Sequence, residues 1–341
     1  MRAVYDTAML LLLAIVVLSG CGPSRQSDSL GSKVKIGVML ADYGLGDQSF
    51  NDTAFLGLVK ARDELDILFD YRDLVSSSSY RDGLIELIED EKCTLVIGLG
   101  NNMIQDFTEV ANLYPSRQFL FIDQRIEAPN VTSITFKEDE GSFLAGIVAG
   151  LKTETNTVGF IGGMDIPVIN RFRDGFAAGV KTVNPDANVI VEYAGDFGTP
   201  AAGKEIAGRF IQERNTDIIY PAAGFTGLGA IEEAASKHIY AIGVDSDQFY
   251  LAENTVITSM VKNIDVAVYK AVKQLVEEGA LSNDHIELGI ADSGVGIAPV
   301  RVVPLSAEQS DLIQLYQDRL LNGTIDIRSQ SARGGTIQRE G

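Results

Sequence analysis

Acidic, amide and aromatic side chains occur near the ends of apolar runs, where they could bind a flat, polar molecule. The residues that share this placement, together with one lysine, are Asp42, Asp47, Phe50, Asn51, Asp123, Phe172, Asp245 and Lys262. Carboxylates accept paired hydrogen bonds from a diol or from heterocyclic N–H groups, and aromatic rings stack on a planar heterocycle. A nucleoside carries all of these groups. The residue types therefore predict a site for a nucleoside-like ligand.

Four of these residues belong to one loop, 40–51, which reads Leu-Ala-Asp-Tyr-Gly-Leu-Gly-Asp-Gln-Ser-Phe-Asn. The loop follows a strand-like run and precedes a helix-like run, so it should lie at the carboxyl end of a parallel strand, where open α/β sheets bind ligands. Each residue also has a purely structural interpretation. An Asp in this position often caps a helix, and a Phe on a helix, such as Phe172, is often a core residue.

Sequence patterns for catalysis are missing. The two histidines, His238 and His285, fit neither a metal site nor a catalytic triad, and the chain has no phosphate-binding G-x-x-x-x-G-K-S/T motif. The run 224–229, Gly-Phe-Thr-Gly-Leu-Gly, is not a dinucleotide fingerprint, but it leads from a strand into a helix. The N–H groups at such a helix start can bind a ligand hydroxyl. We expect a binding protein without cofactor or metal, and no enzyme.

Size and charge narrow the class of protein further. The chain has 341 residues, which exceeds the usual size of one hydrophobic core, so two domains are expected. Its formal net charge is −19, and no basic stripe is present. Nucleic-acid binding depends on clustered Lys and Arg, so we expect no nucleic-acid partner.

The N-terminus has the features of an exported lipoprotein. Arg2 precedes a short apolar run, 8–18, which is too short to span a bilayer. Leu-Ser-Gly-Cys at 18–21 resembles the lipobox of bacterial lipoproteins, which implies removal of residues 1–20 and lipidation of Cys21. The polar, Ser-rich stretch 21–32 is then a lipidated tether. The other cysteine, Cys93, lies in an apolar run and is expected to be a buried hydrophobic residue.

Short apolar runs alternate with helix-length amphipathic segments from residue 33 onward, which predicts βαβ units with parallel sheets. Strands are expected at 34–40, 68–74, 95–99, 119–123, 131–136, 158–163, 189–193, 218–222, 240–245, 256–261 and 286–290. Helices are expected at 51–65, 80–91, 103–114, 170–183, 203–212, 228–237 and 265–278.

The spacing of strand ends indicates two similar α/β lobes. Asp42 and Asp123 are 81 positions apart, and Asp165 and Asp245 are 80 apart. With short crossovers between the lobes, we expect lobe 1 to comprise 33–137 plus 263–281 and lobe 2 to comprise 138–262 plus 282–328. Residues 329–341 are polar and are expected to form a flexible tail.

A family resemblance adds to this interpretation. The run Asp-Tyr-Gly-Leu-Gly-Asp-Gln-Ser-Phe-Asn at 42–51 resembles the Asp-x-Gly-Gly-x-Asn-Asp-Lys-Ser-Phe-Asn loop of the basic membrane protein family. This family comprises lipoprotein receptors of ABC transporters and includes purine nucleoside receptors. Further matches follow in order along the chain at 121–123, 140–146, 158–163, 176–181, 184–185, 243–248 and 258–262.

The resemblance implies a two-lobed periplasmic-binding-protein fold of type I, each lobe a parallel sheet flanked by helices. It also implies a purine nucleoside such as guanosine, inosine or adenosine in the cleft, an ABC transporter permease as partner, and a lipid anchor on the extracytoplasmic face of the cell membrane. In this comparison Phe50 and Phe172 would stack on the base and Asp123 would bind its polar edge. Asp245, Lys262 and the backbone of Gly224 would hold the ribose, and the loop residues Asp42, Asp47 and Asn51 would line the pocket.

Two departures from the family pattern bear on the identity of the ligand. The loop is one residue shorter, with Gly46 where an Asn usually precedes Asp47, and Phe225 follows Gly224 where the family tends to have another Gly. Two alternatives remain at this point. The protein could be a nucleoside-sensing lipoprotein that signals to a membrane partner, or a nucleoside hydrolase, although the sequence offers no metal ligands or dedicated general base for the second.

Overall fold

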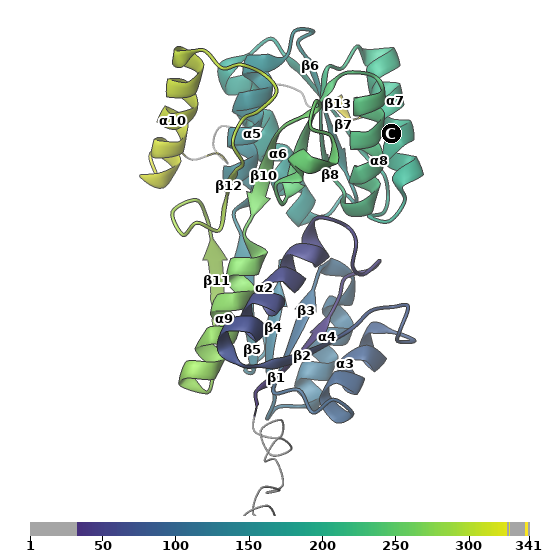
Figure 1. Ribbon diagram of the computed structural model, residues 1–341, viewed down its shortest axis with the longest axis vertical. Helices are drawn as coiled ribbons and strands as arrows, with labels where there is room; N and C mark the ends of the chain where they lie inside the picture. Colours follow the sequence, from purple (N-terminus) through teal and green to yellow (C-terminus); the bar gives the residue numbers. More distant parts are fainter. Residues whose placement is uncertain (1–32, 326, 328–337, 340–341) are drawn as a thin grey trace, which may run out of the picture. The chain divides into compact units, whose positions relative to one another are not determined.

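Two β-sheets, each flanked by helices, form the fold (Figure 1). The structure is a computed structural model that describes residues 33–325, 327, 338 and 339. The expected signal peptide, Cys21 and the tether to residue 32 lie outside the described residues. Among the described residues, no helix combines the length and apolar character needed to cross a membrane.

The first sheet is parallel throughout, with strand order β11-β5-β4-β3-β1-β2. Its strands are β1 (Lys35–Met39), β2 (Leu68–Arg72), β3 (Leu95–Leu99), β4 (Gln118–Ile122), β5 (Val131–Phe136) and β11 (His285–Leu288). Its helices are α2 (Phe50–Leu65), α3 (Tyr80–Glu89), α4 (Ile104–Leu113) and α9 (Ile264–Glu278), with a short 3₁₀ turn η1 (Asn101–Met103). Because helices cover both faces, β3 and β5 are buried along their whole length, and β3 is an uninterrupted apolar run.

The second sheet has the order β12-β10-β9-β8-β6-β7-β13, and among its described strands only the β10–β12 pair is antiparallel. Its strands are β6 (Thr157–Gly162), β7 (Asn188–Tyr193), β8 (Ile218–Ala222), β9 (Tyr240–Asp245), β10 (Val256–Lys262), β12 (Val295–Ile297) and β13 (Gln338–Arg339). Its helices are α5 (Glu138–Lys152), α6 (Pro167–Val183), α7 (Pro200–Arg214), α8 (Gly224–Ser236) and α10 (Ala307–Leu321), with a 3₁₀ turn η2 (Gln248–Leu251).

The two sheets repeat one plan. The order β2-β1-β3-β4-β5 of the first sheet corresponds to β7-β6-β8-β9-β10 of the second. Equivalent strand ends also share a positive φ: it is +86° at Gly100 and +55° at Gly224, and +82° at Asp123 and +63° at Asp245. The spacing of strand ends in the sequence therefore reflects two lobes of similar construction.

After β10 the chain returns to the first lobe, and it stays there longer than we expected. Helix α9 packs on α2 so closely that a Cβ on Gly57 would lie 2.5 Å from the carbonyl oxygen of Asp265. Strand β11 then pairs with β5 in the first sheet, whereas we expected 282–328 in lobe 2; for β11 that assignment is wrong. A four-residue strand does not carry enough pattern to identify its sheet. At the C-terminus, residues 338–339 pair with β7, and the rest of the expected flexible tail lies outside the described residues.

Helices α5 and α6 approach each other through glycines. A Cβ on Gly146 would lie 2.2 Å from the carbonyl oxygen of Phe176, and a Cβ on Gly179 would lie 2.0 Å from that of Phe143. Neither helix could accept a side chain at these points without moving. The matched runs at 140–146 and 176–181 therefore hold glycines that serve the packing of these two helices.

Candidate ligand-binding site

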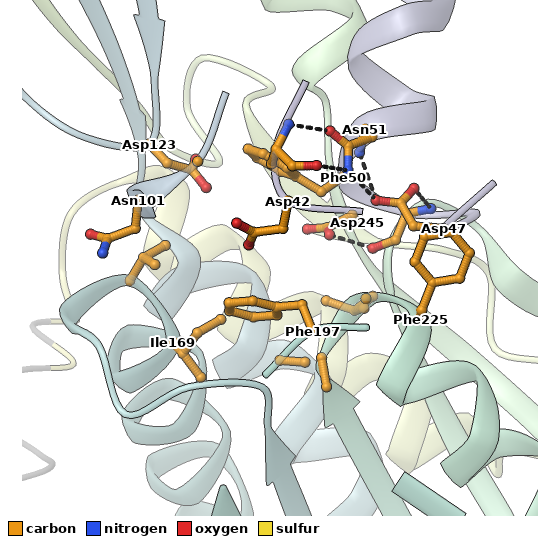
Figure 2. Close-up of a pocket in the computed structure, with 18 of the residues that line it drawn as sticks. Asp42, Asp47, Phe50, Asn51, Asn101, Asp123, Ile169, Phe197, Phe225 and Asp245 are labelled. Carbon is orange, nitrogen blue, oxygen red and sulfur yellow. Dashed lines mark hydrogen bonds between the residues drawn. The ribbon is translucent and has the colours of Figure 1, made fainter. Parts of the chain in front are cut away.

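A cavity of about 740 Å³, counting the space open to solvent, lies where the carboxyl ends of strands from both sheets meet. All nine residues predicted for the site line it: Asp42, Asp47, Phe50, Asn51, Asp123, Phe172, Gly224, Asp245 and Lys262. Figure 2 shows the side chains of Asp42, Asp123 and Asp245 on one side of this space and those of Phe197 and Ile169 on the other. The structure thus brings the predicted residues together from both lobes.

Two of the nine hold the 42–51 loop in shape. The carboxylate of Asp47 accepts hydrogen bonds from the N–H groups of Ser49 (3.0 Å), Asn51 (2.9 Å) and Asp52 (3.2 Å), which caps the start of α2. The side-chain oxygen of Asn51 accepts from the N–H of Ala41 at 2.9 Å, and its NH₂ group donates to Asp47 at 3.0 Å. Burial raises the pKa of Asp47, although its backbone donors oppose this. These contacts match the structural interpretation of an Asp before a helix.

Asp42 is held at the cavity wall by partners from two other segments. Its Oδ1 accepts hydrogen bonds from the hydroxyl of Tyr80 at 2.6 Å and from the side-chain NH₂ of Asn102 at 2.8 Å. Burial, and then the neighbouring Asp42 carboxylate, raises the pKa of Tyr80. Because the Tyr80 hydroxyl keeps its proton, it remains a donor that fixes the orientation of Asp42.

Lys262 and Asp123, which both line the cavity, form a buried ion pair. Nζ of Lys262 lies 2.5 Å from Oδ1 of Asp123 and 3.0 Å from Oε1 of Glu138, and the lysine side chain is 1% exposed. The same Nζ lies 5.4 Å from the ring centroid of Phe50 and 5.5 Å from that of Phe172. Burial alone would lower the pKa of Lys262, but the surrounding carboxylates, first that of Asp123, raise it. The ammonium is therefore charged and contacts the residue that the resemblance assigns to the base.

Asp245 receives a hydrogen bond from the opposite lobe. The hydroxyl of Ser49 donates to its Oδ2 at 2.5 Å, and both residues are buried. Burial raises the pKa of Asp245 to about 6, against the opposing effects of Lys262 and Ser49; the nearby carboxylates of Asp123 and Asp47 add to the rise. This carboxylate is thus costly to ionise in the absence of a ligand.

The 42–51 loop also contacts the second lobe through its backbone. The carbonyl oxygen of Gln48 accepts hydrogen bonds from the hydroxyl of Ser246 at 2.9 Å and from the side-chain NH₂ of Gln248 at 3.1 Å. A Cβ on Gly46 would lie 3.5 Å from Cζ of Phe225. Gly46 and Phe225 are the two substitutions that set this chain apart from the family pattern, and they face each other across the lobes.

Three carboxylates of the cavity sit on backbone that non-glycine residues rarely adopt. φ is +24° at Asp42, +82° at Asp123 and +63° at Asp245. Such conformations cost about 1–3 kcal/mol each and cluster at functional sites. Asp123 and Asp245 hold this conformation at equivalent strand ends, which explains how the two sheets aim acidic side chains into one space.

Sequence reasoning missed several residues of the cavity. Those that also line it include Tyr43, Ser49, Asn101, Asn102, Ile166, Val168, Ile169 and Phe197. Asn101 and Asn102 follow Gly100 at the end of β3, so their place at a strand end was a usable signal. Phe197 lies in the loop between β7 and α7, and its ring packs against Gly163 of the same lobe, a contact that no local sequence pattern indicates.

Comparison with known proteins identifies the family. The sequence model of one protein family, described as ABC transporter substrate-binding protein PnrA-like, matches residues 33–331. The chain belongs to this family, Bmp. It is 35% identical over 268 residues to basic membrane protein A of Borreliella burgdorferi, covering 76% of each chain. It is 29% identical over 364 residues to the ABC transporter nucleoside-binding protein BmpA of Lactococcus lactis subsp. cremoris, covering 96% of this chain and 99% of that protein.

The fold is confirmed by a solved structure. An ABC transporter solute-binding protein from Aeropyrum pernix K1 superimposes with a TM-score of 0.80 at 24% identity, covering 89% of this chain and 99% of that chain. The type I periplasmic-binding-protein fold implied by the sequence is therefore correct. As a Bmp family member, the chain is an ABC transporter substrate-binding protein and not an enzyme.

Proposed function

We propose that the protein binds a purine nucleoside in the cavity and delivers it to the permease of an ABC transporter. The observation that carries this proposal is the meeting of aromatic rings and three carboxylates, Asp42, Asp123 and Asp245, in one interlobe space. Rings take up the faces of a heterocycle, and carboxylates accept hydrogen bonds from N–H and hydroxyl donors.

The geometry supports a division of roles within the site. Phe50 and Phe172 both face the ammonium of Lys262, at 5.4 Å and 5.5 Å, so the two rings flank a common region. We assign the base to this region, with Asp123 at its polar edge. Asp245 and the N–H groups at the start of α8, beginning with Gly224, are assigned to the ribose.

The charge of the lining favours a nucleoside over a nucleotide. Asp42, Asp47, Asp123 and Asp245 line the cavity together with a single cationic side chain, Lys262, which is already paired with Asp123. A phosphate group would be repelled by this surplus of negative charge, whereas neutral hydroxyl groups would be bound by it. The Lactococcus relative, named as a nucleoside-binding protein, is consistent with this choice.

We further propose that lipid on Cys21 holds the protein at the extracytoplasmic face of the cell membrane. The support is the Leu-Ser-Gly-Cys run at 18–21, which follows a charged and then apolar leader. Delivery to a membrane permease requires the receptor to stay near the membrane, and a lipid anchor with a polar tether provides this.

Calorimetric titration with guanosine, inosine, adenosine and cytidine tests the ligand class. We expect the three purine nucleosides to bind and cytidine to bind more weakly. Asp245→Ala should abolish binding because it leaves the ribose hydroxyl groups without an acceptor, and Phe50→Ala should weaken it through lost stacking. Asp165→Ala, at an exposed position between β6 and α6 and outside the cavity lining, is the matched control. Flat traces with all four ligands would refute the proposal, and near wild-type affinity in both site variants would refute the assignment of residues.

A further inference from the structure

Glu138 is a buried carboxylate directly behind the cavity lining. It is the first residue of α5, its side chain is 0% exposed, and it sits just after β5, where the chain passes from the first lobe to the second. One carboxylate oxygen, Oε1, lies 3.0 Å from Nζ of Lys262, and the other, Oε2, accepts a hydrogen bond from Nε of Arg171 at 2.6 Å. Glu138 therefore connects two cations that come from different elements.

The result is a chain of alternating charges that ends at the ligand site. It runs from Arg171 on α6 through Glu138 and Lys262 to Asp123, which lines the cavity. A buried ion pair contributes little net stability because desolvation offsets the attraction between the charges. The order of these charges fits a role in fixing Asp123 better than a role in holding the fold.

We propose that Glu138 and Arg171 are positioning residues, which hold the Lys262 ammonium against Asp123 and so keep the Asp123 carboxylate aimed at the nucleobase of the ligand. This inference rests on the proposed function, since it assigns Asp123 to the polar edge of a nucleoside base. It adds two residues outside the cavity lining to the set that determines affinity.

The two positioning residues act on Asp123 with opposite sign. Burial raises the pKa of Asp123, Lys262 opposes this most strongly, Glu138 adds to the rise, and Arg171 lowers it. Two further acidic residues belong to this neighbourhood: Asp245 on β9, whose own pKa is raised in part by Asp123, and Asp139 beside Glu138, which helps to raise the pKa of Arg171. Removing the negative charge of Glu138 should therefore lower the pKa of Asp123, and removing the positive charge of Arg171 should raise it.

The test is the dissociation constant for guanosine, measured by calorimetry between about pH 4 and about pH 9, a range that runs upward from the ordinary pKa of an Asp side chain. The variants are Glu138→Gln, Arg171→Gln and the charge-conserving Arg171→Lys, with Glu192→Gln as control. Glu192 is paired with Arg209 on the second lobe, outside the cavity lining. Thermal melts establish that each variant is folded, and Arg171, whose side chain is 28% exposed, provides a test if the buried Glu138→Gln variant does not fold.

Near neutral pH we expect both Gln variants to weaken guanosine binding by roughly 10- to 100-fold, the effect that loss of an outer supporting partner has at metal sites. The acidic limb of the affinity profile should move to lower pH in Glu138→Gln and to higher pH in Arg171→Gln, while Arg171→Lys and the control stay near wild type. The inference would be overturned if the acidic limbs of the two affinity profiles moved in the same direction. It would also be overturned if wild type bound guanosine and both Gln variants bound it with unchanged affinity. No guanosine binding by wild type would instead overturn the proposed function.

Discussion

Replacing Asp245 by asparagine should make the ligand-free protein more stable and the binding site weaker. Asparagine has nearly the same shape as aspartic acid but cannot ionise. In the native protein the carboxylate of Asp245 is buried, and its pKa is raised from 3.8 to about 6. A carboxyl group that resists ionisation in the folded state lowers stability whenever the pH forces it to ionise.

The size and sign of the effect follow from this pKa. A rise from 3.8 to about 6 corresponds to about 3 kcal/mol, at 1.36 kcal/mol per pH unit. Because the folded-state pKa is raised, the contribution of Asp245 to stability is fully present below pH 3.8 and is lost as the pH rises through about 6. The Asp245→Asn variant escapes that loss, so its unfolding free energy should exceed that of wild type by up to about 3 kcal/mol at alkaline pH, and the gain should vanish in acid.

Urea denaturation at several pH values measures the gain in unfolding free energy, and titration with a nucleoside measures the loss of affinity. A hydrogen bond to a charged group contributes about 1.5–3 kcal/mol, so affinity should fall by roughly 10- to 150-fold. Asp165→Asn, at an exposed carboxylate, should change stability by no more than about 0.5 kcal/mol. If Asp245→Asn were less stable than wild type in alkali, or if its gain were the same at every pH, the reasoning from burial would be refuted.

Three further changes test other parts of the structure. Ser49→Ala removes the hydrogen-bond donor to Asp245. It should weaken nucleoside binding by about tenfold, the value of a modest charge-assisted hydrogen bond, and it should increase the radius of gyration measured by X-ray scattering. An affinity equal to that of wild type would contradict a role of Ser49 in the contact between the lobes. Gly179→Ala places a Cβ 2.0 Å from a carbonyl oxygen of α5 and should cost about 1–3 kcal/mol in urea denaturation. Its control is Gly208→Ala, where the nearest atom is 3.7 Å away and helix propensity predicts a gain of up to about 1 kcal/mol; the same change in both would count against the packing argument. Cys21→Ser should abolish palmitate labelling and release the protein from the membrane fraction, and retention there would exclude the lipid as the anchor.

Elements buried on both faces could be located from the sequence almost to the residue. Strands β3 and β8 begin and end where the apolar runs do, because a parallel strand covered by helices has no polar face. Helix α5 was missed for a related reason. Twelve of its residues are buried, so the segment has no polar stripe, and the glycines that let it pack on α6 hide its helical character. Helix α10 was missed because it buries only Ile313 and Leu320, which gives too weak a periodic pattern.

The candidate site was predictable to the extent that it consists of strand ends. Asp123 and Asp245 close equivalent strands, so their convergence follows from the topology of parallel sheets. Ser49 and Glu138 could not be found this way. The role of Ser49 exists only when its loop meets the other lobe, and Glu138 starts a helix that the sequence did not reveal. Both depend on contacts between segments far apart in the chain, which no local pattern records.

These contacts connect ligand recognition to the approach of the lobes. Asp123 follows β4 of the first sheet and is paired with Lys262, the last residue of β10 in the second. Asp245 ends β9 of the second sheet and receives its hydrogen bond from Ser49 at the start of α2 in the first lobe. Asp123 and Asp245 therefore each pair with a group from the opposite lobe. Separation of the lobes would break these contacts, so a ligand that uses both carboxylates would bind the closed form more tightly and shift the population toward closure.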